Sequence, residues 1–290
     1  MKNSIASTLK EGIAFLKEAG LEEAALDARI ILCDVLSVSK EYIFTNSKNI
    51  ITLRQYTKYK KALQKRKRGI CTAYITGHKE FRYISLYVTP DVLVPRADTE
   101  ILVEAALECI DKLHAQKNNA ITILDLCCGS GAIALSLLNE TKNIKVYASD
   151  ISHRALKITK LNAKKLKLKP YIKHSNLFSA FCTKKTKTPK IKFDLIVSNP
   201  PYICTDKIKT LSTEVQNEPH LALDGGKDGL AIIQKIISES KKFLKPNGYI
   251  LLEADPAQMK PIIELYKKHG FKNTRVIKDL AEDDRVFLGS

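Results

Sequence analysis

The sequence predicts an α/β protein, with a mostly parallel, doubly wound sheet of seven strands preceded by a small helical bundle and a β-hairpin linker. Three observations predict it. The first 70 residues place apolar side chains at helical spacing and contain no convincing strand. Residues 73–94 change to short strand-like runs. From Pro95 onward strand-like and helix-like segments alternate, which is typical of a parallel sheet covered by helices. We therefore expect a helical domain over 1–72, a linker over 73–95 and an α/β domain over 96–290.

The helical domain is expected to contain four helices. In the first, apolar residues recur at helical spacing between Ile5 and Leu16, and Gly20 offers a stop. The other three are expected at about 22–35, 40–44 and 52–68, and each has one apolar face, as in a bundle. In the linker, the strand-like runs are 74–75, 81–83 and 86–88, and the turn-forming residues Gly77 and Pro90 interrupt or end them.

The α/β domain is expected to alternate regularly. Strands are predicted at 121–126, 145–149, 171–174, 193–198 and 249–253, with a terminal pair at 271–277 and 285–288. Helices are predicted at 98–112, 132–139, 153–166, 227–244 and 259–269. The Thr/Lys/Pro-rich stretch over 183–190 is expected to be a flexible loop.

Bulk composition narrows the class of protein. No apolar stretch approaches the roughly 18 residues that span a bilayer, and the N-terminus has no signal-peptide pattern, so we expect a cytoplasmic protein without membrane contact. The seven cysteines are scattered and include no CxxC pair, which favours reduced thiols and gives no support for a metal site.

The net charge of +17 raises the possibility of nucleic-acid binding. Lysine carries most of it, in clusters at 58–68, 164–169 and 184–192. Lysine-rich faces are more often simply solvated, so we do not expect direct binding to nucleic acid. A basic, non-catalytic nucleic-acid-binding module remains the alternative from another functional class.

Asn199-Pro200-Pro201-Tyr202 is the most informative motif, because it directly follows the apolar run 193–198. It therefore lies at the carboxyl end of a predicted strand, where open α/β sheets bind their ligands. The prolines fix two φ angles and hold Asn199 extended. The Asn199 carboxamide and a backbone carbonyl can then accept both hydrogens of a planar NH2 group, with Tyr202 as an aromatic wall. The alternative is a proline-rich turn after a buried strand.

A glycine turn and an acidic residue indicate a nucleoside site. The segment Asp125-Leu126-Cys127-Cys128-Gly129-Ser130-Gly131 joins a strand to a helix, and its glycines allow backbone to approach a ligand closely. Asp150 ends the next strand, about 20 residues on, where it can accept both ribose hydroxyls. The alternative for Asp150 is an N-cap for the helix at His153. After the third strand, Asn176-Leu177-Phe178 suits an adenine slot.

Together these segments resemble the class I S-adenosylmethionine-dependent methyltransferases. The resemblance implies that Asp125 and the Cys127–Gly131 turn wrap the methionine part of the cofactor. It also implies that the Asn-Pro-Pro-Tyr motif serves methylation of a conjugated NH2 group, as in adenine-N6, cytosine-N4 and protein-glutamine N5 methyltransferases.

Further motifs are similar to those of the peptide chain release factor N5-glutamine methyltransferases, the HemK/PrmC family. These are Pro95-Arg96-Ala97-Asp98-Thr99-Glu100, about 100 residues before Asn199, the Ala73–Gly77 run, the Glu218–Gly229 segment and the ending at Asp284-Arg285. The resemblance covers nearly the whole chain. It implies methyl transfer from S-adenosyl-L-methionine to the glutamine of the GGQ motif in release factors, with a helical domain that helps to dock the release factor. We expect the protein to be a monomer. A DNA methyltransferase would need a target-recognition domain, and no free segment is large enough.

Three positions depart from that family's pattern. Cys127-Cys128 stand where the family begins its turn with glycine, so we expect the cysteines to take ordinary φ angles or the loop to differ slightly. Asn176 replaces a common Asp, and Glu253 is followed by Ala254-Asp255-Pro256 without the usual glycine. Arg96, Glu100 and Glu218 match family positions, but their roles stay open, and Arg96 with Glu100 can equally form an ion pair at a helix start.

The predicted mechanism is mainly alignment, because an amide nitrogen is a weak nucleophile and the methyl sulfonium is a strong electrophile. Asn199 Oδ1 and the Pro200 carbonyl are expected to accept the two N–H bonds of the substrate glutamine. Pro201 fixes the turn and the Tyr202 ring packs on the amide plane. No general base is required. A glutamine methyltransferase of a ribosomal protein, or an amino-methyltransferase of nucleic acid, remains an alternative with the same chemistry.

Overall fold

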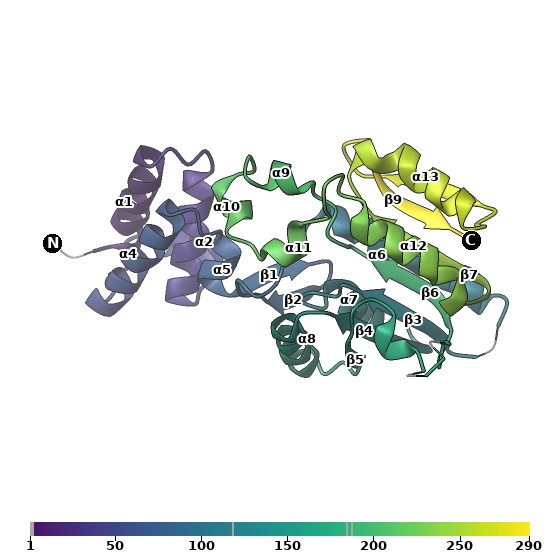
Figure 1. Cartoon of the computed structure of the whole chain (residues 1–290). Coiled ribbons are helices and arrows are strands. Elements are labelled where there is room, and N and C mark those ends of the chain that lie inside the picture. Colours follow the sequence, from purple (N-terminus) through teal and green to yellow (C-terminus); the bar gives the residue numbers. More distant parts are fainter. Residues whose placement is uncertain (1–2, 118, 184, 187) are drawn as a thin grey trace. The chain divides into compact units, whose positions relative to one another are not determined.

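The computed structural model describes residues 3–290 except 118, 184 and 187. The predicted N-terminal domain therefore includes two residues, 1 and 2, that lie outside the described residues, as do 184 and 187 of the loop expected over 183–190. The chain forms two compact units (Figure 1). The first comprises Met1–His78 with Ser212–Asn217, and the second comprises Lys79–Leu211 with Glu218–Ser290.

The first unit is helical. Its helices are α1 (Ile5–Glu18), α2 (Ala24–Leu36), α3 (Lys40–Thr45), α4 (Leu53–Lys67), α5 (Thr72–Thr76) and α10 (Thr213–Gln216). Side-chain oxygens of Ser4, Ser39 and Thr52 cap α1, α3 and α4, which is why these helices begin where they do. The four predicted helices are confirmed to within two residues at each end. The strand expected at 74–75 is wrong, because these residues lie in α5.

The core of the first unit comes from the apolar stripes of α1, α2 and α4, including Leu16, Leu32 and Leu63. Arg66 is also buried, and its guanidinium bonds to Asp27 Oδ2 at 2.7 Å and to the Glu214 carboxylate. This ion pair fixes α10 to the helical unit, although α10 is distant in sequence.

The predicted hairpin is confirmed as a two-stranded sheet of β1 (His78–Phe81) and β2 (Ile84–Tyr87). The strand expected over 81–83 is wrong beyond Phe81, because Arg82 turns the chain with a φ of 47°. The Arg82 guanidinium pairs with Glu140 at 2.7 Å, and its backbone N–H donates to Glu100 Oε1 at 3.0 Å.

The second unit contains the predicted seven-stranded sheet, and its fold class is confirmed. The strand order is β5-β4-β3-β6-β7-β9-β8, parallel except for β9, which pairs antiparallel with β7 and β8. The strands are β3 (Ile121–Leu126), β4 (Ile144–Asp150), β5 (Tyr171–His174), β6 (Phe193–Ser198), β7 (Leu244–Glu253), β8 (Thr274–Lys278) and β9 (Asp284–Gly289).

Helices cover both faces of this sheet (Figure 1). The longer ones are α6 (Asp98–His114), α7 (Ala132–Glu140), α8 (His153–Lys165), α12 (Ala231–Phe243) and α13 (Met259–Lys268). Alternate residues of β3, β6 and β7, such as Leu124, Ile196 and Leu252, join one buried cluster with α12 and α13. Because side chains alternate along a strand, the intervening residues face α6 and α7 on the opposite side. The shorter helices are α9 (Thr205–Ile208), α11 (His220–Leu223), η1 (Ser179–Phe181) and η2 (Pro256–Gln258).

Helix α12 begins four residues later than predicted. Gly229 has a φ of 74°, which ends any helical path through it, and a Cβ there would lie 2.2 Å from the Tyr202 carbonyl oxygen. Residues 227–230 therefore form a tight turn against the Asn-Pro-Pro-Tyr segment.

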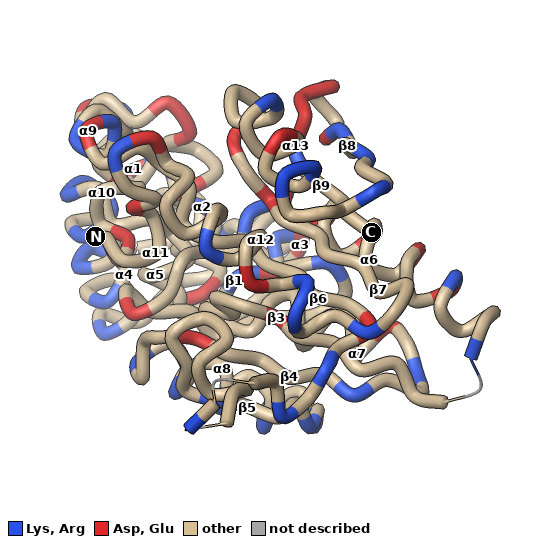
Figure 2. The backbone as a smooth tube through the Cα atoms, turned by 45° about the vertical axis from the view of Figure 1, so that its right-hand side comes forward, with Lys and Arg blue, Asp and Glu red and all other residues tan. Residues whose placement is uncertain are grey.

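Basic residues recur along α8 (Figure 2), where Lys157, Lys160, Lys164 and Lys165 are exposed. Among the described residues, no helix is long and apolar enough to cross a membrane.

Candidate active site

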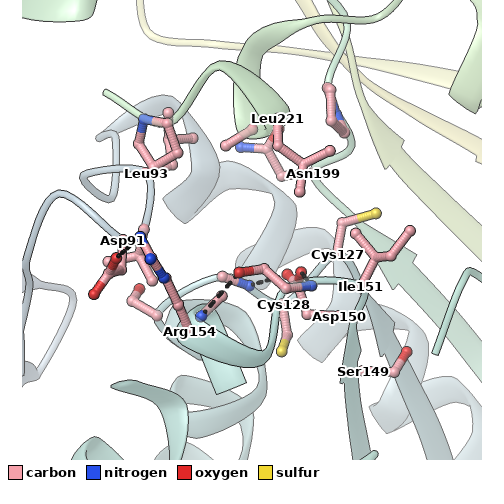
Figure 3. A pocket seen from close by; sticks show the side chains of 18 of the residues that line it. Asp91, Leu93, Cys127, Cys128, Ser149, Asp150, Ile151, Arg154, Asn199 and Leu221 are labelled. Atoms are coloured by element: carbon pink, nitrogen blue, oxygen red, sulfur yellow. Dashed lines mark hydrogen bonds and ion pairs between the residues drawn. The ribbon is translucent and has the colours of Figure 1, made fainter. Parts of the chain in front are cut away.

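A cavity of about 420 Å³ opens at the carboxyl ends of β3, β4 and β6, and its lining residues all belong to the second unit. Five chain segments contribute most of the lining, and Figure 3 shows several of their side chains. They supply Pro90, Asp91, Val92, Leu93 and Pro95; Cys127, Cys128, Gly129 and Ser130; Ser149, Asp150, Ile151 and Ser152; Ser175, Asn176 and Leu177; and Pro219, Leu221, Ala222 and Asp224. Thr99, Asn199 and Pro201 also line it.

The turn after β3 uses left-handed backbone at three positions, with φ values of 58° at Cys127, 54° at Gly129 and 86° at Gly131. The expectation of ordinary φ angles at the cysteines is therefore wrong for Cys127, which takes the conformation that favours glycine. Gly131 is needed for a second reason, because a Cβ there would lie 2.8 Å from Thr159 Cγ2.

Helix α8 holds this turn through two polar side chains. Thr159 Oγ1 donates to the Gly129 carbonyl at 2.8 Å, and Asn162 Nδ2 donates to the Ser130 carbonyl at 3.0 Å. Asn162 also exchanges hydrogen bonds with the Tyr87 backbone in β2. The sequence analysis missed both residues. The available signal was two polar residues, three apart, on the otherwise apolar face of a helix.

The two adjacent thiols point in different directions (Figure 3). Cys128 Sγ lies 3.7 Å from Thr159 Oγ1, whereas Cys127 lines the cavity beside Ser198. Burial raises the pKa of both thiols, so both are neutral at physiological pH and neither is a thiolate nucleophile.

Asp150 braces the turn as well as lining the cavity. Its Oδ2 accepts from the Gly129 N–H at 2.9 Å and its Oδ1 accepts from the Ser152 N–H at 2.8 Å. Burial raises the pKa of this carboxyl, while these backbone donors oppose the rise. The capping interpretation is wrong, because Ser152 Oγ caps α8 by accepting from the Ala155 N–H at 3.1 Å.

Asp125 lies beneath the turn and is not among the residues that line the cavity. Its side chain is fully buried, and Oδ2 accepts from the Ala134 N–H at 3.1 Å in the first turn of α7. Burial raises the pKa of its carboxyl well above the ordinary value. Gly131 likewise belongs to the turn but does not line the cavity.

The segment predicted to contact adenine, 176–178, lies partly in the cavity wall and partly in the buried core. Asn176 and Leu177 line the cavity, and Leu177 turns the chain with a φ of 48°. Phe178 is buried and stacks on Phe243 of α12, with ring centroids 4.4 Å apart.

Asn199 connects the cavity to the start of α6. Its Nδ2 donates to Thr99 Oγ1 at 3.0 Å, and both residues line the cavity. With this orientation, Oδ1 is the amide atom left to accept from a ligand. Pro201 lines the cavity beside it, whereas Pro200 is buried.

Tyr202 points away from the cavity and is not among its lining residues. Its hydroxyl donates to Glu253 Oε1 at 3.4 Å, and its carbonyl accepts from Gln258 Nε2 at 2.9 Å. Burial raises the pKa of the Tyr202 phenol, so it stays protonated and can donate. The sequence analysis assigned no role to Glu253 or Gln258.

Glu218 lies in the segment before α11, next to the cavity-lining Pro219, but does not itself line the cavity. It is 5% exposed, its Oε2 accepts from the Val94 N–H at 3.0 Å, and its Oε1 pairs with Arg96. The suggested Arg96–Glu100 ion pair is therefore wrong, because Arg96 pairs with Glu218 and Glu100 accepts from the Arg82 backbone.

Comparisons with known proteins match both parts of the chain. The PrmC N-terminal domain family model matches residues 7–77, and the methyltransferase small domain model matches residues 104–216. The catalytic domain of hMettl16, a solved structure, has a TM-score of 0.56 and 12% identity over 89% of this chain and 90% of its own, which supports the fold alone.

Full-length relatives are more specific. A release factor glutamine methyltransferase from Clostridium acetobutylicum is 38% identical over 98% of this chain and 97% of its own. One from Borreliella burgdorferi is 38% identical over 97% of this chain and 93% of its own. A bifunctional methyltransferase from Rickettsia felis is 35% identical over the whole chain, which corresponds to 58% of the longer relative. By these matches, and by the motifs that line its cavity, the chain belongs to the release factor glutamine methyltransferase family.

Proposed function

We propose that this protein transfers a methyl group from S-adenosyl-L-methionine to the side-chain nitrogen of a glutamine in peptide chain release factors. The observation that carries the proposal is the placement of Asn199. Its amide is anchored by Thr99 at the wall of a cavity that the glycine turn and Asp150 also line. Membership of the family supports the choice of glutamine in a release factor over other NH2 groups.

The cavity suits the proposed cofactor. Its volume of about 420 Å³ lies within the roughly 300–1,000 Å³ range of small-molecule sites. The left-handed turn after β3 exposes backbone for close approach of a ligand, and Asp150 offers an acidic acceptor suited to ribose hydroxyls. Asn176 and Leu177 supply one polar and one apolar group at the same wall. When bound, S-adenosyl-L-methionine supplies the electrophilic methyl group.

The residues of the chain supply alignment. Asn199 Oδ1, at the cavity wall, accepts one N–H bond of the substrate amide, which directs the nitrogen lone pair toward the methyl group. We no longer assign the second acceptor to the Pro200 carbonyl, because Pro200 is buried and does not line the cavity. The bound cofactor would supply the methyl group and leave as S-adenosyl-L-homocysteine, and the methylated nitrogen would release a proton to water. The buried phenol of Tyr202 holds the motif by its contact with Glu253. We no longer assign its ring to the wall that contacts the substrate amide, because Tyr202 does not line the cavity.

We propose that the protein acts as a monomer in the cytoplasm and that the helical unit docks the release factor. The exposed lysines of α8 favour an acidic partner but do not by themselves indicate nucleic acid. A ribosomal protein is the second candidate substrate, since the chemistry at Asn199 would be the same.

The test measures methyl transfer from labelled cofactor to purified release factor, to ribosomal proteins and to DNA. We expect transfer to release factor, and loss of that transfer when its GGQ glutamine is replaced by alanine. Asn199→Ala should lower turnover by about 100–1,000-fold, by analogy with the loss of one aligned hydrogen bond at a reacting centre. It should leave cofactor affinity, measured by calorimetry, nearly unchanged. Asn199→Asp keeps an acceptor and should be less impaired.

Asn273→Ala is the matched control, because Asn273 is exposed in the same unit and lies outside the cavity. It should retain normal turnover. Normal turnover in Asn199→Ala at saturating cofactor would refute the alignment role, and transfer to DNA or ribosomal protein but not to release factor would refute the substrate assignment.

A further inference from the structure

The helical unit carries an open groove between α1 and α3, which encloses about 530 Å³. Helix α1 supplies one wall, and α3 with the residues that follow it supplies the other. The lining residues are Ala6, Leu9, Lys10, Ile13, Ala14 and Lys17 on the first wall, and Ile43, Phe44 and Ser47 on the second. All of them belong to the first unit, whereas the residues that line the candidate active site belong to the second. The groove is therefore a separate site.

Helix α1 has a second apolar stripe beside the one that it buries. The buried stripe includes Leu16 and packs in the core of the unit. The second stripe runs from Ala6 to Ala14, with apolar residues at i, i+3, i+7 and i+8, which is the spacing of one helix face. Its two alanines are exposed, and Leu9 and Ile13 are only partly buried. Because the first stripe already anchors α1 to the bundle, the second is available to a helix of a partner.

The shape of the groove suits such a helix. The short side chains of Ala6 and Ala14 allow a second backbone to approach α1 closely. On the opposite wall Phe44 is 61% exposed, so its ring offers contact area to a partner rather than to the core. At about 1.5 Å per residue, the stripe from Ala6 to Lys17 is about 17 Å long, which matches a partner helix of about three turns.

The charges at the groove are of one sign. Lys10 and Lys17 line it, and none of the described lining residues is acidic. Neither lysine takes part in an ion pair within the described part of the chain. The Arg29 guanidinium lies 5.9 Å from the centre of the Phe44 ring and adds a cation at the opposite wall. A partner that complements this surface is therefore both apolar and acidic.

We propose that this groove binds an acidic amphipathic helix of the release factor. The inference rests on the proposed function, in which the helical unit docks that protein. The apolar face of the partner helix packs on the second stripe of α1 and against Phe44, and its acidic side chains pair with Lys10 and Lys17. A nucleic-acid backbone complements the groove less well, because it would meet the two lysines but leave the aliphatic stripe uncovered.

The first experiment measures steady-state methyl transfer to full-length release factor at saturating cofactor. Ala14→Gln fills the groove without adding charge, and Phe44→Ala removes the exposed ring. Each should raise the KM for release factor about tenfold, an effect typical of a residue at the centre of an interface. The kcat should not change, since these variants remove binding that the ground state and the transition state share. Ala25→Gln, at an exposed position of α2 outside the groove, is the matched control and should keep the wild-type KM.

A second set of variants tests the acidic character of the partner. Lys10→Glu combined with Lys17→Glu should raise the KM about tenfold at about 50 mM salt and much less at about 500 mM, because salt screens exposed charges. Lys61→Glu combined with Lys65→Glu changes the net charge equally, at exposed positions of α4 outside the groove. This control should change the KM by no more than about twofold, because a distant charge contributes only through the overall field.

Photo-crosslinking identifies the occupant without relying on turnover. A benzoylphenylalanine that replaces Ala14 should cross-link to full-length release factor, and mass spectrometry should place the cross-link on a helical segment rich in Asp and Glu. The same replacement at Ala25 should give no such cross-link. Both positions are exposed, so both variants should fold as the wild type does, which far-ultraviolet circular dichroism checks.

A wild-type KM in both Ala14→Gln and Phe44→Ala would overturn the docking role. Cross-links from Ala14 to a second copy of this chain, or to ribosomal RNA added in competition, would overturn the choice of partner. If the wild type transfers no methyl group to release factor, the proposed function fails instead. The cross-link from position 14 distinguishes the two failures, because it reports on binding at the groove whether or not methyl transfer occurs.

Discussion

Replacement of Glu253 by glutamine should make the protein more stable at alkaline pH but not at acid pH. Burial raises the pKa of this carboxyl from its ordinary value of 4.5 to about 7 in the folded state. Between these two values the folded state binds more protons than the unfolded state, so stability falls as pH rises from about 4.5 through about 7. At about 1.4 kcal/mol per pKa unit, ionising the buried carboxyl costs about 3 kcal/mol in full. Glutamine does not ionise and avoids that cost.

The assay is urea unfolding followed by far-ultraviolet circular dichroism, because the chain has no tryptophan to report on unfolding. The stability difference between Glu253→Gln and the wild type should shift in favour of glutamine by about 3 kcal/mol between about pH 4.5 and about pH 8. Comparing the two proteins at each pH cancels the contributions of the other buried acids, Asp125 and Asp150. The exposed Glu108→Gln replacement should show no such shift. A stability difference that stays constant across this pH range would refute the reasoning.

Three further replacements have defined outcomes. Asp150→Ala should weaken cofactor binding, measured by calorimetry, by about 1.5–3 kcal/mol for each hydrogen bond to the charged acceptor. Unchanged affinity would show that Asp150 has only a structural role, as the acceptor for the Gly129 and Ser152 N–H groups. Cys127→Gly should unfold at a higher temperature than Cys127→Ala, reversing the usual order, because a left-handed φ costs a residue with a Cβ about 1–2 kcal/mol; a more stable alanine variant would contradict this. Asp194→Asn should lower the urea midpoint of unfolding at neutral pH. The difference from the wild-type midpoint should disappear as pH falls below about 4, because Asp194 has a lowered pKa in the folded state. A difference that does not depend on pH would contradict a stabilising role for the Asp194 ion pairs.

Much of the fold was predictable because local pattern and burial agree. The β3 and β6 segments are apolar runs bounded by turn residues, and every residue in them is buried as their composition predicts. Helices α1, α3 and α4 of the first unit begin at serine or threonine caps that the sequence displays. In these elements the nearest neighbours in sequence decide the structure.

The site was less predictable because its contacts join distant segments. Asn199 and Thr99 are 100 residues apart, and Arg96 pairs with Glu218 across 122 residues. Cys127 takes a left-handed φ that residue type alone argues against. The start of α12 is set by the close approach of Gly229 to Tyr202, which no helical periodicity reveals. Tertiary packing decides each of these features.

The pKa values of buried acidic residues shift in opposite directions at the two ends of β6 and its neighbouring strands. Near the start of β6, burial raises the pKa of Asp194, but Lys117, Lys245 and the Thr122 N–H outweigh it and leave the pKa lowered. Ionised Asp194 therefore favours the folded state. At the carboxyl edge, Asp125 and Glu253 are equally buried, their pKa values are raised, and each has an oxygen without a partner of strict geometry among the described residues. Folding alone would favour a neutral side chain at both positions. The unpartnered oxygens of Asp125 and Glu253 therefore lie at the end of the strands where the cavity opens, although neither residue lines it, so the stability lost by burying these carboxyls is lost beside the candidate site.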